Sequence, residues 1–170
     1  MSETMRPTPE AERLHRELEA VWGNPPGWRG RLSVVNHSTL GLRFMATGLV
    51  FFLLGGVLAM LIRTQLALPD QAFMSPEIYA QVTTMHGTVM MFLFAIPMLE
   101  GLAIYLIPKM IGTRDLVCPR LTAFGYWCYL FGGIILFSSL LLEMAPDSGW
   151  FMYTPLSSSE FAPGPGSDFW

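Results

Sequence analysis

The feature that most constrains this chain is the apolar run at residues 85–108, MHGTVMMFLFAIPMLEGLAIYLIP. At a helical rise of about 1.5 Å per residue, the run is long enough to cross the hydrocarbon core of a bilayer. It nevertheless contains His86 and Glu100, and an ionisable side chain at membrane depth costs several kcal/mol unless it finds a partner. Imidazole is a preferred axial ligand of haem iron. The run therefore predicts that His86 holds a haem inside a helical bundle, and the alternative that it only bonds a neighbouring carbonyl stays open.

Two further apolar runs, at residues 44–62 and 121–142, complete the predicted architecture. The sequence is 52% hydrophobic and only 14% charged, which fits a polytopic membrane protein better than a soluble domain. The segment 109–120 is too short to return across a membrane, so the second and third spans must run antiparallel. We expect an all-α fold with three transmembrane helices.

The distribution of positive charge predicts the orientation of these helices. Nine of the ten Lys and Arg residues precede the first run or lie in the segment 109–120. By the positive-inside rule, the extension 1–43 and the loop 109–120 face the cytoplasm, and the loop 64–79 and the tail 144–170 face outward. The extension lacks the pattern of a cleavable signal peptide and predicts a short surface helix with a linker. We expect a multi-pass protein of the inner (plasma) membrane with a cytoplasmic amino terminus.

Two other features are read from the residues alone. Arg63 ends the first apolar run about 23 residues before His86, so both residues are expected at the same level of the bundle, where the arginine would meet polar substituents of a haem. The alternative is an ordinary arginine that extends from a helix end to the membrane surface. The last residues, GPGSDFW, suggest that the chain stops just before another span, as a truncated product or a split subunit.

Several motifs resemble subunit I of the haem-copper oxidases. They are TTMHGTVMMFLFAIPMLEGLAIYLIP with the following KMIGTRDLVCPRL, LIRTQLALPD before it and SGWFMYTPLSS after it. The resemblance covers residues 43–170, and its motifs agree in order and spacing. It implies that this chain forms the first three helices of a twelve-helix bundle.

The resemblance also implies roles for individual residues. His86 matches one of two axial ligands of the low-spin haem, for which haem A is expected, and Arg63 matches an arginine that bonds a ring substituent of that haem. Tyr79 matches a tyrosine near the haem edge, and Trp150 matches a tryptophan packed near the haem propionates. Asp115 matches the aspartate at the mouth of the proton-uptake route called the D-channel.

The sequence departs from the family pattern along that route. Where family members that pump through it usually carry asparagines, this chain has Ile104, Thr122 and Ala123. Asparagine amides order the waters that relay protons, whereas isoleucine cannot. Glu100 lies four residues before Ile104 and so on the same helix face. One hypothesis is that Glu100 and Thr122 replace part of the polar path. The alternative hypothesis is that Glu100 pairs with a residue on another helix and that the proton-uptake route is altered or closed.

The function implied is that of the amino-terminal part of a terminal respiratory oxidase, which reduces oxygen to water while protons cross the membrane. The high-spin haem and copper belong to later helices in this family, so these residues are not catalytically competent alone. The expected partners are the remaining helices of subunit I, subunits II and III, membrane lipid, and cytochrome c or quinol as electron donor; no nucleic acid is expected. The alternatives are a quinol-oxidising member, a small haem-binding electron-transfer anchor, and a haem-free assembly subunit.

Overall fold

The computed structural model describes residues 8–23 and 26–170, which belong to two compact units that meet in sequence between Val34 and Val35. The first unit contains α1 (Pro9–Trp22) and α2 (Gly27–Leu32). The hydroxyl of Thr8 caps α1 by accepting a hydrogen bond from the Ala11 N–H at 3.3 Å. The surface helix expected within the extension is therefore present as α1.

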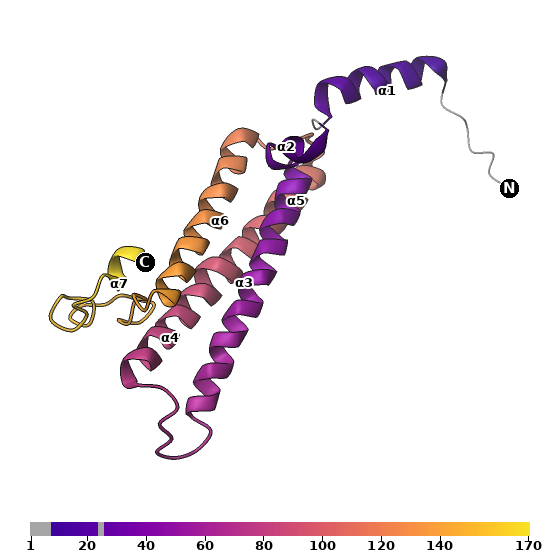
Figure 1. Ribbon diagram of the computed structural model, residues 1–170. Coiled ribbons are helices and arrows are strands. Elements are labelled where there is room, and N and C mark those ends of the chain that lie inside the picture. Colours follow the sequence, from indigo (N-terminus) through magenta and orange to yellow (C-terminus); the bar gives the residue numbers. More distant parts are fainter. Residues whose placement is uncertain (1–7, 24–25) are drawn as a thin grey trace. The chain divides into compact units, whose positions relative to one another are not determined.

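The second unit is a bundle of three long helical segments that run side by side (Figure 1). They are α3 (His37–Gln65); the continuous segment of α4 (Pro76–Thr88), the π-helix η1 (Val89–Ala95) and α5 (Ile96–Ile111); and α6 (Pro119–Leu141). A short helix, α7 (Gly166–Phe169), follows. All three long segments are long and apolar enough to cross a membrane. The prediction of an all-α membrane protein with three spans is confirmed.

The helices are longer than the apolar runs from which they were predicted. α3 begins at His37, seven residues before the expected start at residue 44, because the Asn36 side chain caps it by accepting from the N–H groups of Ser38 and Thr39. α4 begins at Pro76, inside the segment 64–79 that was expected to be a loop, with Ser75 as its cap. Apolar runs mark the part of a helix that lies in hydrocarbon, whereas the caps decide where the helix ends.

The π-helix interrupts the second span just before Pro97. In it the Ile96 N–H donates to the Met91 carbonyl, five residues back. Pro97 has no N–H to offer the Leu93 carbonyl four residues before it. The hydroxyl of Tyr129 on α6 donates to that carbonyl at 2.6 Å. A side chain of the third span thus satisfies a backbone group that proline leaves without its usual helical partner.

The bundle packs through facing glycines at one end and apolar side chains along its length. A Cβ atom added to Gly41 of α3 would lie 2.6 Å from the Gly101 carbonyl oxygen of α5, so the two backbones touch there. Two buried clusters fill the rest of the bundle. The larger contains Phe51, Leu58, Val82, Met85, Val89, Leu93, Leu136 and Ala145, and the smaller contains Leu40, Phe44, Ile104 and Tyr126.

Candidate functional site

His86 lies in the last turn of α4 and points toward α3. Its Nδ1 atom lies 3.0 Å from the Gly55 carbonyl oxygen. Because a carbonyl only accepts hydrogen bonds, Nδ1 carries the proton and the lone pair lies on Nε2. A metal-bound histidine typically has this arrangement, in which one ring nitrogen donates to a carbonyl and the other is left for the metal. The hydrogen bond to a neighbouring carbonyl, considered above as an alternative to haem ligation, is therefore compatible with it.

The tail segment around Trp150 docks on α4 beside His86. A Cβ atom added to Gly87 would lie 2.6 Å from Cδ1 of Trp150, so the indole covers the glycine directly. The Gly149 N–H donates to the Thr84 hydroxyl at 2.9 Å, which fixes the same segment to α4. The structure thus places Trp150 next to the residue that follows His86.

Arg63 and Tyr79 lie farther along the bundle. Gly55, not Arg63, is the α3 residue beside His86, and Arg63 follows Gly55 by eight residues, or about 12 Å along the helix axis. The expectation that Arg63 and His86 share one level is therefore wrong. Tyr79 precedes His86 by seven residues, which places it two turns away on the same face of α4. Both residues are thus displaced from His86 in the same direction, toward the loop between α3 and α4.

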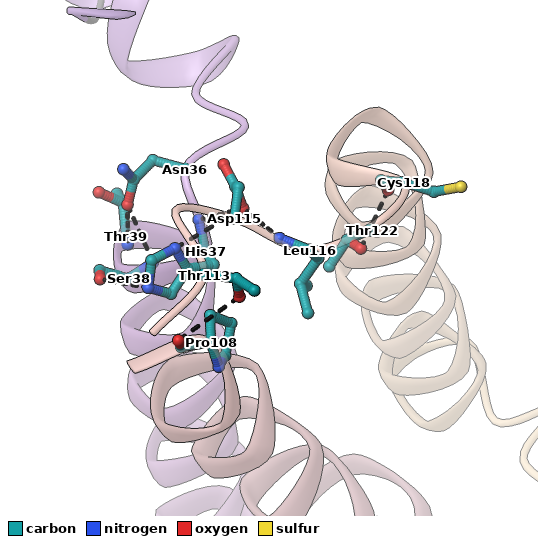
Figure 2. A network of polar contacts seen from close by, with 10 residues as sticks. All are labelled: Asn36, His37, Ser38, Thr39, Pro108, Thr113, Asp115, Leu116, Cys118 and Thr122. Carbon is teal, nitrogen blue, oxygen red and sulfur yellow. Dashed lines mark hydrogen bonds and ion pairs between the residues drawn. The ribbon is translucent and has the colours of Figure 1, made fainter. Parts of the chain in front are cut away.

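Asp115 lies in the loop between α5 and α6, and its contacts with His37 connect this loop to the start of α3 (Figure 2). Its Oδ1 atom accepts from the backbone N–H groups of His37 at 3.2 Å and Leu116 at 2.9 Å. The buried His37 imidazole adds a third neighbour, with Nδ1 at 3.6 Å from the same oxygen. A carboxylate at a helix amino terminus is favoured by the free N–H groups and the helix dipole. Asp115 is therefore a fixed, partly exposed carboxylate at this end of the bundle.

Apolar side chains lie next to Asp115 in the bundle. Ile104 is 7% exposed and belongs to the smaller cluster, with Leu116 packed against it. Thr122 directs its hydroxyl to the Cys118 carbonyl at 3.2 Å rather than to Glu100. Glu100 is exposed on α5. The geometry thus gives no direct link between Thr122 and Glu100, the two residues suggested as replacements for the asparagines.

Sequence reasoning missed several residues that shape these sites. His37 falls within the predicted extension 1–43, but it starts α3 and contacts Asp115. Thr84 anchors the Trp150 segment, and Trp170 donates from Nε1 to the Thr88 hydroxyl at 2.9 Å. The Asn36 capping residue before the first span was the one available signal for His37. Nothing local in the sequence pairs Thr84 with Gly149 or Thr88 with Trp170.

Within the described residues, His86 is a single donor and not part of a cluster of metal ligands. Within residues 8–23 and 26–170, no three His, Cys, Asp or Glu side chains converge to hold a metal ion. A haem iron needs only axial ligands from the protein, because the porphyrin supplies the other four. His86, whose Nδ1 bonds the Gly55 carbonyl and whose Nε2 keeps its lone pair, is the residue that could supply one such ligand. The fold and the site thus define a multi-span helical membrane protein with a histidine that contacts the neighbouring helix inside the bundle.

Comparison with known proteins gives the family. A profile of cytochrome c and quinol oxidase polypeptide I matches residues 39–170. The chain is 45% identical over 166 residues to a putative cytochrome c oxidase subunit 1-beta of Streptomyces coelicolor, covering 97% of this chain and 28% of that protein. It is 44% identical to a probable cytochrome c oxidase subunit 1-alpha of Streptomyces avermitilis, covering 82% of this chain and 24% of that protein.

A more distant relative is the heme-copper oxidase subunit I+III of Aeropyrum pernix, 41% identical over 81% of this chain and 17% of that protein. The chain thus spans about a quarter of the length of these two Streptomyces relatives. The chain belongs to the family of cytochrome c and quinol oxidase polypeptide I, the subunit I of the haem-copper oxidases. In that family the complete subunit carries haem and copper.

Proposed function

We propose that this chain forms the amino-terminal part of the catalytic subunit I of a terminal respiratory oxidase. The complete subunit reduces oxygen to water and couples this reaction to proton translocation. This part contributes one axial ligand of the low-spin haem and a proton-uptake entrance, and is not catalytically competent alone. Family membership over residues 39–170 favours this function over a small haem-binding anchor or a haem-free assembly subunit.

The observation that carries the haem assignment is the hydrogen bond from His86 Nδ1 to the Gly55 carbonyl at 3.0 Å. It holds the imidazole inside the bundle and leaves the Nε2 lone pair for iron. His86 would hold the low-spin haem, with haem A expected, and Trp150 would pack at its edge. Arg63 and Tyr79, two turns away, would meet its substituents. When bound, the haem accepts and passes single electrons, while the protein fixes the ligand orientation and excludes water.

Asp115 is proposed to collect protons at the mouth of the uptake route. Its carboxylate is partly exposed and held by two backbone N–H groups, so it offers a fixed acceptor at the end of the bundle. The positive charge of the extension 1–43 and of the loop 109–120 favours the cytoplasmic side for this end. We propose that the protein lies in the inner (plasma) membrane with its amino terminus in the cytoplasm.

The high-spin haem and copper are proposed to bind the later helices of subunit I, and oxidase subunits II and III to complete the complex. Cytochrome c is the proposed electron donor, because the curated relatives are named cytochrome c oxidases. The matching family also includes quinol oxidases, so a quinol donor is the second candidate. Measuring how fast the purified complex oxidises reduced cytochrome c and a quinol distinguishes the two candidate donors.

The test of the haem assignment uses the assembled oxidase complex with His86→Leu. The reduced-minus-oxidised spectrum should lose the low-spin haem contribution. His15→Leu is the matched control, because His15 is an exposed residue of α1 whose ring lies 3.9 Å from Glu19. A low-spin haem spectrum that survives in His86→Leu would overturn the assignment.

The test of the proton-uptake role uses Asp115→Asn in the same complex. Asparagine keeps an oxygen acceptor for the His37 and Leu116 N–H groups but cannot take up a proton. We expect slower proton uptake with an unchanged haem spectrum. Uptake at the wild-type rate would show that protons do not pass through Asp115.

A further inference from the structure

The π-helix η1 separates two parts of the second span that are each held against α3. On one side the backbones of α5 and α3 touch, since a Cβ atom added to Gly101 would lie 2.9 Å from the Gly41 carbonyl oxygen. On the other side His86 Nδ1 lies 3.0 Å from the Gly55 carbonyl oxygen. The conformation of η1 therefore determines how the turn that contains His86 is rotated relative to α5.

A π-helical turn changes this rotation, because it holds more residues than an α-helical turn. The Ile96 N–H donates to the Met91 carbonyl five residues back, whereas an α-helical turn closes on the fourth residue. One residue corresponds to about 100° around a helix axis, so one additional residue in a turn is a large change. If η1 became α-helical while α5 kept its place, the His86 side chain would no longer face Gly55.

The Leu93 carbonyl is the group through which α6 holds η1. Pro97 has no N–H to offer this carbonyl, and the Tyr129 hydroxyl donates to it at 2.6 Å. Leu93 is only 8% exposed and belongs to the larger buried cluster, where a carbonyl without a donor is unfavourable. A rotation of η1 would carry the carbonyl away from the hydroxyl. The hydrogen bond therefore opposes that rotation.

Two buried rings of α3 hold the Tyr129 ring in place. The Phe44 ring is stacked on it, with the ring centres 5.5 Å apart and an angle of 15° between the planes. The Phe51 ring meets it edge to face, with the centres 5.8 Å apart. Phe44 and Phe51 are 2% and 5% exposed, so neither ring leaves room for the tyrosine to swing. The Tyr129 hydroxyl is therefore a donor at a fixed position.

The first residues of η1 contact the same glycine that accepts the hydrogen bond from His86. A Cβ atom added to Gly55 would lie 2.8 Å from Sδ of Met90 and 3.3 Å from Cγ1 of Val89. Val89 is fully buried, so η1 and α3 have no free space between them at this level. A change in the conformation of η1 therefore reaches the contact between His86 and Gly55 directly.

We propose that Tyr129 is a positioning residue for His86. Its hydroxyl holds the Leu93 carbonyl, this bond keeps η1 in the π-helical conformation, and η1 sets the orientation of the His86 imidazole. The inference rests on the proposed role of His86 as an axial ligand and names the residue that orients that ligand. Tyr129 acts through the backbone of η1, and no proton or electron passes through it.

The test compares Tyr129→Phe with Tyr126→Phe in the assembled oxidase complex. Tyr126→Phe is the matched control, because it removes a phenolic hydroxyl of the same helix that faces the Thr47 hydroxyl of α3 at 3.1 Å. The readout is the set of g values of the low-spin haem, which depend on the orientation of the axial imidazole. In Tyr129→Phe a second orientation of His86 should become about two- to tenfold more populated, as expected for one lost hydrogen bond, and should add a second set of g values. Tyr126→Phe should keep the wild-type set.

A second variant changes the same hydrogen bond from the side of the second span. Pro97→Ala supplies the N–H that an α-helical turn would direct to the Leu93 carbonyl, so it competes with the Tyr129 hydroxyl for this acceptor. We expect the same second set of g values. Pro97→Ala also decides the question if Tyr129→Phe does not assemble, because wild-type g values in Pro97→Ala would then overturn the proposal.

The outcomes separate this inference from the proposed function. Wild-type g values in Tyr129→Phe would overturn the positioning role, and the assignment of His86 as a ligand would stand. An equal change in Tyr126→Phe would also overturn the positioning role, because the change would then reflect general packing rather than the bond to Leu93. A low-spin signal that survives in His86→Leu would instead overturn the assignment of the ligand itself.

Discussion

The two ends of the bundle are stabilised in different ways. At the His86 end, a tail segment covers α4 with an aromatic ring, and Trp150 lies on Gly87 while Gly149 is bonded to Thr84. At the Asp115 end, two helix backbones touch through Gly41 and Gly101, and one carboxylate caps α3. The His86 end depends on the docking of the Trp150 segment on α4. The Asp115 end depends on direct contact between the backbones of α3 and α5. Changes at the His86 end should therefore alter the haem site first, and changes at the Asp115 end should alter the stability of the bundle.

Gly41→Ala tests the Asp115 end and should have the largest effect on stability. The added Cβ would lie 2.6 Å from the Gly101 carbonyl oxygen and 2.9 Å from the Tyr105 backbone nitrogen, and neither can move without separating α3 from α5. We expect a loss of about 3 kcal/mol, measured as a lower midpoint of thermal unfolding of the assembled complex. Gly125→Ala is the control, since nothing lies within 4 Å of its added Cβ. Equal midpoints for the two variants would contradict the backbone contact.

Gly87→Ala tests the His86 end. The added Cβ would meet the Trp150 ring at 2.6 Å, but the ring belongs to a loop and can shift. We expect a smaller loss, about 1–2 kcal/mol, together with a displaced haem absorption band. Gly56→Ala, whose added Cβ meets nothing within 4 Å, should leave both unchanged. A normal haem band in Gly87→Ala would show that Trp150 does not lie at the haem.

Thr84→Val isolates the hydrogen bond that holds the same loop. Valine keeps the shape of the side chain but removes the acceptor of the Gly149 N–H, so the loss should be about 1 kcal/mol. Hydrogen exchange at the Gly149 amide should become faster. Thr83→Val is the matched control, because Thr83 is the exposed neighbour on the same helix. Equal exchange rates in the two variants would argue against a docked loop.

Labelling of Cys118 tests the assignment of the two ends to the two sides of the membrane and should not affect stability. Cys118 is exposed at the start of α6, in the loop that contains Asp115. In a Cys128→Ser background, a membrane-impermeant maleimide should modify it in inverted vesicles and not in intact cells. The reverse pattern would place the Asp115 end outside and remove its role in proton uptake from the cytoplasm.

The spans could be predicted from the sequence because hydrocarbon imposes a long apolar run on any helix that crosses it. The helix ends were predicted less well, because the apolar runs stop short of the capping residues Asn36 and Ser75. His86 stood out as an ionisable residue inside an apolar run. Its neighbour Gly55 did not, because the contact depends on the register of two helices. The expectation that Arg63 lies at the level of His86 was wrong for the same reason.

The Asp115 end shows the same limit of sequence reasoning. Asp115 was identified through the resemblance, but its bond to the His37 N–H joins residues 78 positions apart. The bond from the Tyr129 hydroxyl to the Leu93 carbonyl was also out of reach. That bond depends on Pro97 freeing the Leu93 carbonyl and on the register that brings Tyr129 to it. Local patterns predict which residues are unusual, whereas tertiary packing decides what each one contacts.

The most direct test of the central claim is chemical rescue of His86→Gly in the assembled oxidase complex. Removing the imidazole should abolish the low-spin haem signal in the electron paramagnetic resonance spectrum, and added free imidazole should restore it by occupying the vacated space beside Gly55. A low-spin signal that persists in His86→Gly without imidazole would contradict the assignment of His86 as an axial ligand.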